Sequence, residues 1–361
     1  DPAVAVPYEP FSPAAFGPAR YRPVRFRDCL PVADVFADGN GPDVVHAWTP
    51  REIVREFCER LRHQREFSLV VHLEDNEECI LERQAGVAFE KLRREKDVEI
   101  PEHLSHPIRY RNFLASAKGI TLIMDRLDEH VPDGVPSLLL WPGADTERFF
   151  PRNRDRSLAA KLGIAPSTWV IGYNGNVHPA NAQEVRSVYL AAALLSREGL
   201  PTVVLRTGRD YCRFLGEDET WARRVSIELG YIDYAWMPEV LACADVLVQP
   251  GKPGPFNDYR FPCKLPEYLA TGKPVVLPAT NVGNHLVHGR EALVYPAVDA
   301  LQIVEAVRTL AADEELRRTL ARGSVAFATE HLRWPQRTER LARFYESLLA
   351  ESTRAPTASF A

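Results

Sequence analysis

The chain has 361 residues, with 44 Lys and Arg against 49 Asp and Glu, so its formal net charge is −5. Domains usually contain about 100–200 residues, so this length favours two of them. The mild negative charge argues against a nucleic-acid-binding protein, which would carry a basic surface.

The cysteines and the apolar runs favour a cytoplasmic protein. No two of the six cysteines lie within three residues of each other, so the CxxC spacing typical of zinc sites is missing. No apolar run reaches the roughly 18–20 residues that cross a bilayer, and no signal peptide is visible. We therefore expect no membrane span and no metal site, while peripheral contact with a membrane stays open.

The first half of the chain alternates short apolar runs with helical patterns. We expect a helix over 51–62, because Ile53, Val54, Phe57 and Leu61 form one apolar stripe. Another helix starts near Glu77, and strands are expected over 43–46, 68–72, 120–124 and 137–140. A polar stretch with a proline, 151–155, is interpreted as the linker between the domains.

The second half repeats this alternation. Strands are expected over 169–173, 202–205, 225–229, 245–248 and 274–277, and helices over 182–197, 238–243, 262–270, 300–310, 313–331 and 335–350. Strands that alternate with helices predict parallel sheets, and ligands then bind beyond the carboxyl ends of the strands.

These patterns predict an α/β chain with two Rossmann-like domains, 1–150 and 151–334. The last helix, about 335–350, is expected to pack back on the first domain, and 352–361 to form a flexible tail.

One stretch, PCKLPEYLATGKPVV at 262–276, combines groups that suit a nucleotide diphosphate. Pro262 suits the first turn of a helix, which would place Lys264 and Glu267 on one face. A helix N-terminus and an ammonium group attract phosphates, and a carboxylate can accept both hydrogen bonds of a ribose diol. An amphipathic helix with a surface ion pair explains the same residues equally well.

This stretch resembles the donor-site helix of the family 4 glycosyltransferases. Five further segments are similar to the family in the same order, through nearly all of 137–350 and more loosely over 42–80: LLLWPGADTERFFP at 138–151, VIGYNGNVHPANAQEV at 170–185, ELGYI at 228–232, MPEVLACADVLVQP at 237–250 and NVGNHLVHGREALVYP at 281–296. The resemblance implies the GT-B fold, in which two Rossmann-like domains face each other across a cleft.

The resemblance also implies roles for individual residues. Glu267 would bind the donor ribose, and Lys264 the diphosphate, helped by Arg206 or Arg260. Lys264, Arg206 and His72, a histidine that faces the reacting sugar, form the candidate catalytic set. The other candidates on the donor side are Asn174, Gly175, Asn176, Ile232, Asn257, Asp258, Tyr259 and Leu265, and those on the acceptor side are Asp75 and Asn76.

Each of these roles has a structural alternative. Arg206 could form a surface ion pair, and Asn174 and Asn176 could serve turn geometry alone, since Asn tolerates left-handed backbone. His72 could be a hydrogen-bonded core histidine. Asp75 and Asn76 could cap the helix that follows them.

The chain departs from the family pattern at three places. Tyr259 stands where the family often has a glutamate, and the usual Arg and Lys after the first donor-domain strand are missing. We also find no counterpart of the first strand and the glycine-rich loop before Asp1, so we expect the chain to begin inside a domain.

The resemblance implies a retaining, metal-independent glycosyltransferase that uses a nucleoside-diphosphate sugar, such as a UDP or GDP sugar, and no further cofactor. Its partners would be this donor and a hydroxyl acceptor, which could be a glycan, a lipid-linked sugar or a small molecule. A nucleotide-sugar epimerase and a non-catalytic nucleotide-sugar-binding relative remain as alternatives. The base, the sugar and the acceptor are left open.

Overall fold

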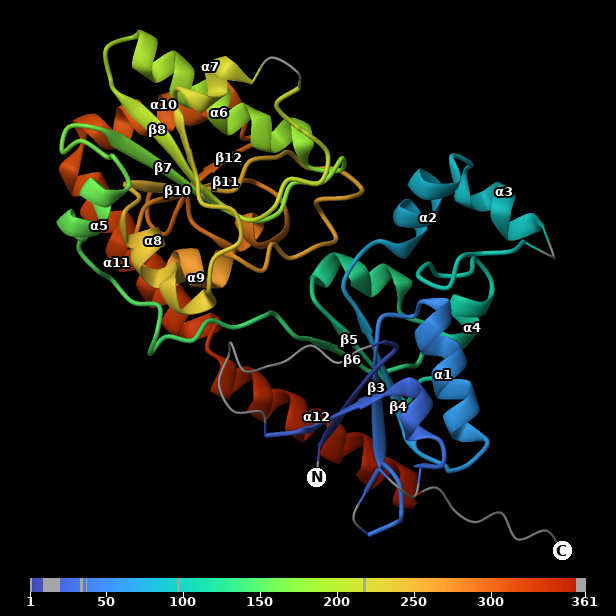
Figure 1. The fold of residues 1–361 in the computed structure, drawn as a ribbon. Coiled ribbons are helices and arrows are strands. Elements are labelled where there is room, and N and C mark those ends of the chain that lie inside the picture. Colours follow the sequence, from blue (N-terminus) through green and yellow to red (C-terminus); the bar gives the residue numbers. More distant parts are fainter. Residues whose placement is uncertain are drawn as a thin grey trace, which may run out of the picture. The chain divides into compact units, whose positions relative to one another are not determined.

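The computed structural model describes residues 2–8, 20–32, 35–36, 38–95, 98–216 and 219–354, without the side chains of 351–354. The chain forms two compact units, each of which contains a parallel sheet flanked by helices (Figure 1). Unit 1 comprises Asp1–Trp141 and Arg337–Ala361, and unit 2 comprises Pro142–Gln336. The division at Trp141 precedes the stretch 151–155 that the sequence suggested as a linker.

The main sheet of unit 1 has four parallel strands in the order β3-β4-β5-β6. They are β3 (Val44–Trp48), β4 (Ser68–Leu73), β5 (Gly119–Leu122) and β6 (Ser137–Leu139). Every residue of β4 is buried, which explains its unbroken apolar run. Two short strands, β1 (Ala3–Val6) and β2 (Arg22–Arg25), pair separately.

Five α-helices complete the described part of unit 1: α1 (Glu52–Arg62), α2 (Glu77–Ala85), α3 (Phe89–Arg94), α4 (Arg109–Ala115) and most of α12 (Trp334–Arg354). Helix α12 lies against β5, because a Cβ atom on Gly119 would come within 2.7 Å of Phe344 and 2.8 Å of Leu348. The helix continues past residue 352, where the sequence predicted the tail to start, and 355–361 lie outside the described residues.

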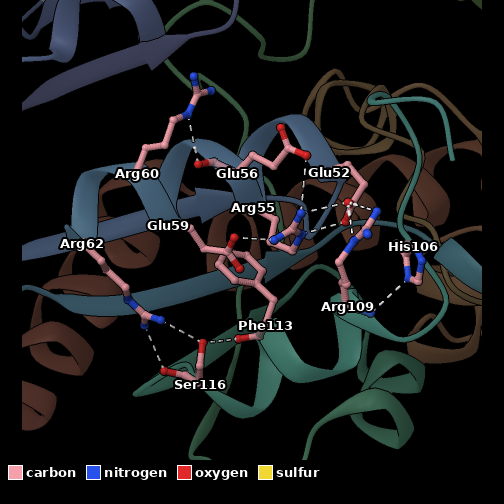
Figure 2. Close-up of polar contacts among 10 residues, drawn as sticks. All are labelled: Glu52, Arg55, Glu56, Glu59, Arg60, Arg62, His106, Arg109, Phe113 and Ser116. Carbon is pink, nitrogen blue, oxygen red and sulfur yellow. Dashed lines mark hydrogen bonds and ion pairs between the residues drawn. The ribbon is translucent and has the colours of Figure 1, made fainter. Parts of the chain in front are cut away.

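Helix α1 is tied to α4 through a buried carboxylate. Glu52, 2% exposed, accepts hydrogen bonds from Arg55 at 2.7 and 2.9 Å and from Arg109 at 2.8 Å (Figure 2). Arg55 also pairs with Glu59 at 2.5 Å. Because a buried charge is tolerated only when it is paired, the Glu52–Arg109 contact holds α1 against α4.

Unit 2 contains a six-stranded parallel sheet in the order β12-β11-β10-β7-β8-β9. Its strands are β7 (Trp169–Asn174), β8 (Thr202–Thr207), β9 (Ser226–Glu228), β10 (Val246–Val248), β11 (Val275–Pro278) and β12 (Leu293–Tyr295). The direction in which the sheet grows reverses between β7 and β10. Ligands of such sheets bind beyond the carboxyl ends of the strands at this reversal.

Helices cover both faces of this sheet (Figure 1). Helix α6 (Ala182–Arg197) lies beside α10 (Ala300–Ala312) on one face, over a core that includes Tyr189, Leu195 and Val307. Helix α9 (Leu265–Ala270) lies beside α11 (Glu314–His331) on the other. Three shorter helices are α5 (Arg156–Lys161), α7 (Thr220–Arg223) and α8 (Met237–Ala242). Among the described residues, no helix is both long and apolar enough to span a membrane.

Candidate active site

Helix α9 starts later than the sequence suggested. We expected Pro262 in its first turn, but the helix begins at Leu265, and Pro266 occupies the first turn. The reason is that a helix from Pro262 would place Pro266 one turn inside, where its missing N–H and its ring break the helical hydrogen-bond pattern. Pro262 instead lies in the preceding turn, where its carbonyl accepts from Leu265 N at 2.9 Å.

Lys264 carries an enclosed ammonium group at the start of this helix. Its Nζ atom lies 3.8 Å from the centre of the Tyr173 ring and 3.1 Å from where a Cβ atom on Gly175 would stand. Within the described part of the chain, no carboxylate lies at ion-pair distance from Nζ. Burial, with a smaller contribution from Arg260, lowers the pKa of Lys264 to about 7.

Glu267 lies one turn further on, with its carboxylate enclosed. Its Oε1 atom accepts a hydrogen bond of 2.7 Å from Tyr234, a ring that also lies against Phe149 and under the guanidinium of Arg148. Burial raises the pKa of Glu267 to about 7. No ion pair joins Glu267 to Lys264, so the alternative of a surface ion pair on this helix is wrong.

The carboxyl ends of β7 and β8 meet beside Lys264. A Cβ atom on Gly208 would come within 2.4 Å of the Gly175 carbonyl oxygen, so this close approach of the two turns requires glycine at position 208. Asn174 Oδ1 accepts from Thr207 at 2.8 Å, and Asn176 Oδ1 accepts from the backbone N–H of Arg209 at 2.8 Å. The two asparagines therefore do build the turn geometry, and they leave the Gly175 backbone close to the ammonium group.

A carboxylate that the sequence did not single out organises the loop before α9. Glu184, in the first turn of α6, accepts a hydrogen bond of 2.8 Å from Asn257 and lies 3.7 Å from Arg260. Arg260 donates to Asn257 Oδ1 at 3.0 Å, and Asp258 accepts from the Thr280 hydroxyl. The sequence signal that could have identified Glu184 is its position in the first turn of the helix that follows a glycine turn. Tyr259 and Leu265, two other predicted donor-side residues, are buried.

Arg206 points into the interior of unit 2. It is 5% exposed, donates to Glu228 at 2.6 Å and lies over the Phe214 ring. The ion pair that the sequence left open is present, with the Arg206 side chain buried and that of Glu228 37% exposed. None of the contacts that the structure shows for Arg206 joins it to Lys264.

Ile232 lies in the turn between Gly230 and Tyr234 and is half-buried. Among the described residues, no hydrogen bond uses its backbone N–H or carbonyl. These two groups are therefore available to a ligand, as a base-recognition segment requires.

The candidate residues of unit 1 follow β4. His72 is 1% exposed; its Nδ1 atom hydrogen-bonds Thr121 at 2.7 Å, and its Nε2 atom has no partner among the described residues. Asn76 caps α2 by accepting from the backbone N–H of Cys79 at 3.0 Å, and Asp75 lies 3.7 Å from Arg51. The capping alternative therefore holds for Asn76, while His72 is only half satisfied as a core histidine.

Comparison with known families and structures adds an independent line of evidence. Residues 168–313 match the family model described as Glycosyl transferases group 1. This segment of the chain is similar to the group 1 glycosyltransferases. Lys264, Glu267, Gly175 and Glu184 all lie within the matched segment. Comparison with curated protein sequences gives no match.

The chain shares the GT-B fold with solved structures at low sequence identity. A sucrose-phosphate synthase from Thermosynechococcus elongatus aligns with a TM-score of 0.67 and 16% identity over 90% of this chain and 79% of its own. Anabaena HepE, in complex with UDP and glucose, aligns with a TM-score of 0.68 and 14% identity over 91% and 86%. The structure of HepE in complex with UDP-glucose aligns with a TM-score of 0.64 and 16% identity, over 84% of this chain and 79% of its own. At this identity the likeness shows the fold.

Proposed function

We propose that this chain is a glycosyltransferase that moves a sugar from a nucleoside-diphosphate sugar to a hydroxyl acceptor, with retention of configuration and without a metal ion. The observation that carries the proposal is the enclosed ammonium group of Lys264. It lies at the carboxyl end of β7, beside a glycine turn. No carboxylate of the described residues forms an ion pair with it, and the charge of Glu184 offsets only part of the effect of burial on its pKa. Such a cation fits a ligand that brings its own negative charge.

Lys264 would stabilise the diphosphate as it leaves. Charge develops on the phosphate oxygens when the bond to the sugar breaks, and a fixed cation in a poorly hydrated site opposes it strongly. Helix α9 has only six residues, so the lysine contributes more to this stabilisation than the helix N-terminus does. We propose no catalytic pair of carboxylates: the diphosphate itself would take the acceptor proton on the same face of the sugar.

The remaining donor contacts follow from free hydrogen-bonding groups. Tyr234 holds one carboxylate oxygen of Glu267, so the other can accept from a ribose hydroxyl. The backbone of Ile232 would meet the base, and the loop 254–260, fixed by Glu184, would select the sugar. Arg206 would have a structural role, because its guanidinium already donates a hydrogen bond to Glu228. His72 and Asp75 would lie on the acceptor side.

A UDP sugar is the first donor to test, because HepE, which shares the fold, binds UDP and UDP-glucose in its structures. Thermal unfolding should be followed with a panel of UDP, GDP and other nucleotide sugars. A ligand at 100 times its Kd adds about 2.7 kcal/mol of stability, which is readily seen. The proposal fails if no member of the panel raises the melting temperature.

Product analysis separates transfer from the two alternatives. The best-binding donor is incubated alone and with pooled hydroxyl acceptors, and the products are identified by mass and anomeric configuration. We expect a retained glycoside that appears only with acceptor. Rearranged donor in the absence of acceptor would indicate an epimerase, and binding without turnover a non-catalytic relative.

A further inference from the structure

Four side chains of unit 1 form one continuous hydrogen-bonded row. The Tyr345 hydroxyl, from α12, lies 2.7 Å from His46 Nδ1, and His46 Nε2 lies 2.9 Å from the Thr121 hydroxyl. The same hydroxyl lies 2.7 Å from His72 Nδ1. The row ends at His72 Nε2, which is buried and has no partner among the described residues. Three adjacent strands, β3, β4 and β5, hold it in register.

Thr121 makes all the hydrogen bonds of the row run in the same direction. It is fully buried, and its hydroxyl meets only the two histidine nitrogens within the described part of the chain. Accepting from both would leave a buried O–H without an acceptor, which is costly. The hydroxyl therefore donates to one histidine and accepts from the other. Burial lowers the pKa of His46 to about 4 and that of His72 to about 3, so each ring is neutral and carries one proton.

Two directions remain. They differ in the bond between Tyr345 and His46 and at His72 Nε2, which carries a proton in one direction and a lone pair in the other and has no partner among the described residues in either. In one direction Tyr345 donates to His46, which donates to Thr121, which donates to His72. In the reverse direction the two bonds of Thr121 have the same chemistry, but His46 donates to the phenolic oxygen. An imidazole nitrogen is a far better acceptor than a phenolic oxygen, and a phenol is the better donor. The first direction is therefore favoured, and Tyr345 decides it.

We propose that Tyr345, acting through His46 and Thr121, holds the proton of His72 on Nε2, so that His72 offers a hydrogen-bond donor at the end of β4. The Trp48 ring covers the His72 ring, and the centres of the two rings lie 4.1 Å apart. The tautomer of His72 is therefore set by the hydrogen-bonded row and not by contact with bulk water. Tyr345, His46 and Thr121 are positioning residues.

The consequence for catalysis rests on the proposed function. With Nε2 already protonated and Nδ1 occupied by Thr121, His72 cannot take a proton from the acceptor hydroxyl. It can donate a hydrogen bond to an oxygen of the sugar or of the acceptor. This assigns His72 to orientation of an oxygen ligand and excludes it as a general base.

The test is the tautomer of His72 in the full chain, measured without any ligand. Histidine labelled with ¹⁵N is observed at pH 8 by long-range ¹H–¹⁵N correlation, and the loss of signals in His72→Gln identifies His72. The exposed His63 reports the ratio of the two tautomers in water. We expect a smaller share of the Nδ1-protonated form at His72 than at His63.

Tyr345→Phe should raise that share at least about threefold, because one hydrogen bond no longer favours the first direction. Tyr110→Phe, which removes a hydroxyl bonded to Glu78 elsewhere in unit 1, is the matched control and should change nothing. Thr121→Ser, which keeps the hydroxyl, should behave like the wild type. Circular dichroism checks the fold of each variant.

A wild-type His72 protonated on Nδ1, or a tautomer share that Tyr345→Phe leaves unchanged, would overturn the proposal. No nucleotide enters this measurement, so its outcome is independent of donor binding. If the chain shows the expected tautomer but binds no nucleotide sugar, the proposed function is refuted and the proposal that Tyr345 controls the tautomer of His72 stands.

Discussion

The Nζ atom of Lys264 lies 3.8 Å from the centre of the Tyr173 ring, and none of the described carboxylates is close enough to form an ion pair with it. Desolvating an ammonium group without an opposite charge lowers stability, and the lowered pKa of about 7 reports that effect. The fold therefore keeps a buried ammonium group at some expense to its own stability.

Lys264→Met should make the protein more stable while weakening donor binding at least tenfold. The pKa of Lys264 falls from 10.5 to about 7, so the unfolded chain binds more protons between these values, and wild-type stability rises with pH across this window. One pKa unit corresponds to about 1.4 kcal/mol, and we expect at least that gain for Lys264→Met at pH 6. Urea unfolding at pH 6 and pH 9 measures the stability of the two proteins and its dependence on pH, and calorimetric titration measures their donor affinity.

Lys161→Met is the control, because Lys161 is exposed in the same unit. Removing its charge should change neither the stability nor the affinity for the donor. A Lys264→Met protein that is less stable than the wild type at pH 6 would contradict the account of an unneutralised buried cation.

Donor affinity should peak near pH 7. Below about 7, Glu267 becomes protonated and loses an acceptor for the ribose; above about 7, Lys264 loses the proton that pairs with the diphosphate. Both phosphates of a nucleotide sugar are esterified, so the ligand itself does not titrate in this range. Calorimetric titrations between pH 5.5 and 9 should give a bell-shaped profile. Glu267→Gln should flatten its acid side and Lys264→Met its alkaline side; a flat wild-type profile would argue against both roles.

Tyr234→Phe should move the acid side of that profile to higher pH. The hydrogen bond from Tyr234 lowers the pKa of Glu267, so without it the carboxylate forms only at higher pH. Tyr211→Phe, at a ring that is 56% exposed, serves as the control and should reproduce the wild-type profile. An acid side that stays in place in Tyr234→Phe would show that this bond does not tune Glu267.

Gly208→Ala should reduce both stability and donor affinity, because the new Cβ atom would meet the Gly175 backbone at 2.4 Å and push that turn away from Lys264. Gly199→Ala is a matched control: its φ of +89° is close to the +98° of Gly208, and nothing lies within 4 Å of the added atom. Both variants bear the strain of a positive φ, of order 1 kcal/mol. Melting temperature and donor affinity should fall further in Gly208→Ala; equal losses would refute the role of the glycine contact.

Much of the fold follows from the sequence because its strands are buried on both faces. The unbroken apolar runs at β4, β10 and β11 predicted these strands, and the helix expected over 182–197 has the bounds of α6, Ala182–Arg197. Short elements that lack a clear period, such as α4 and β12, were not predicted. Their conformation depends on tertiary contacts, as the Glu52–Arg109 pair at the start of α4 illustrates.

The candidate site was predictable in part. Lys264 and Glu267 stood out by their spacing, which left an ion pair between them as an equal alternative. In the structure Lys264 instead contacts Tyr173, and Glu267 contacts Tyr234. Glu184 escaped notice because its partners, Asn257 and Arg260, lie more than seventy positions away in sequence. Arg206 looked like a phosphate ligand because nothing local reveals that Glu228, on the next strand, occupies it.

The most direct test of the donor site is calorimetric titration of a UDP sugar, beginning with UDP-glucose, into the wild type, Lys264→Met and Glu267→Gln at pH 7. We predict that the wild type binds and that each variant binds at least about tenfold more weakly, a loss of about 1.4 kcal/mol or more. Equal affinity in all three proteins would contradict the assignment of the donor site to Lys264 and Glu267.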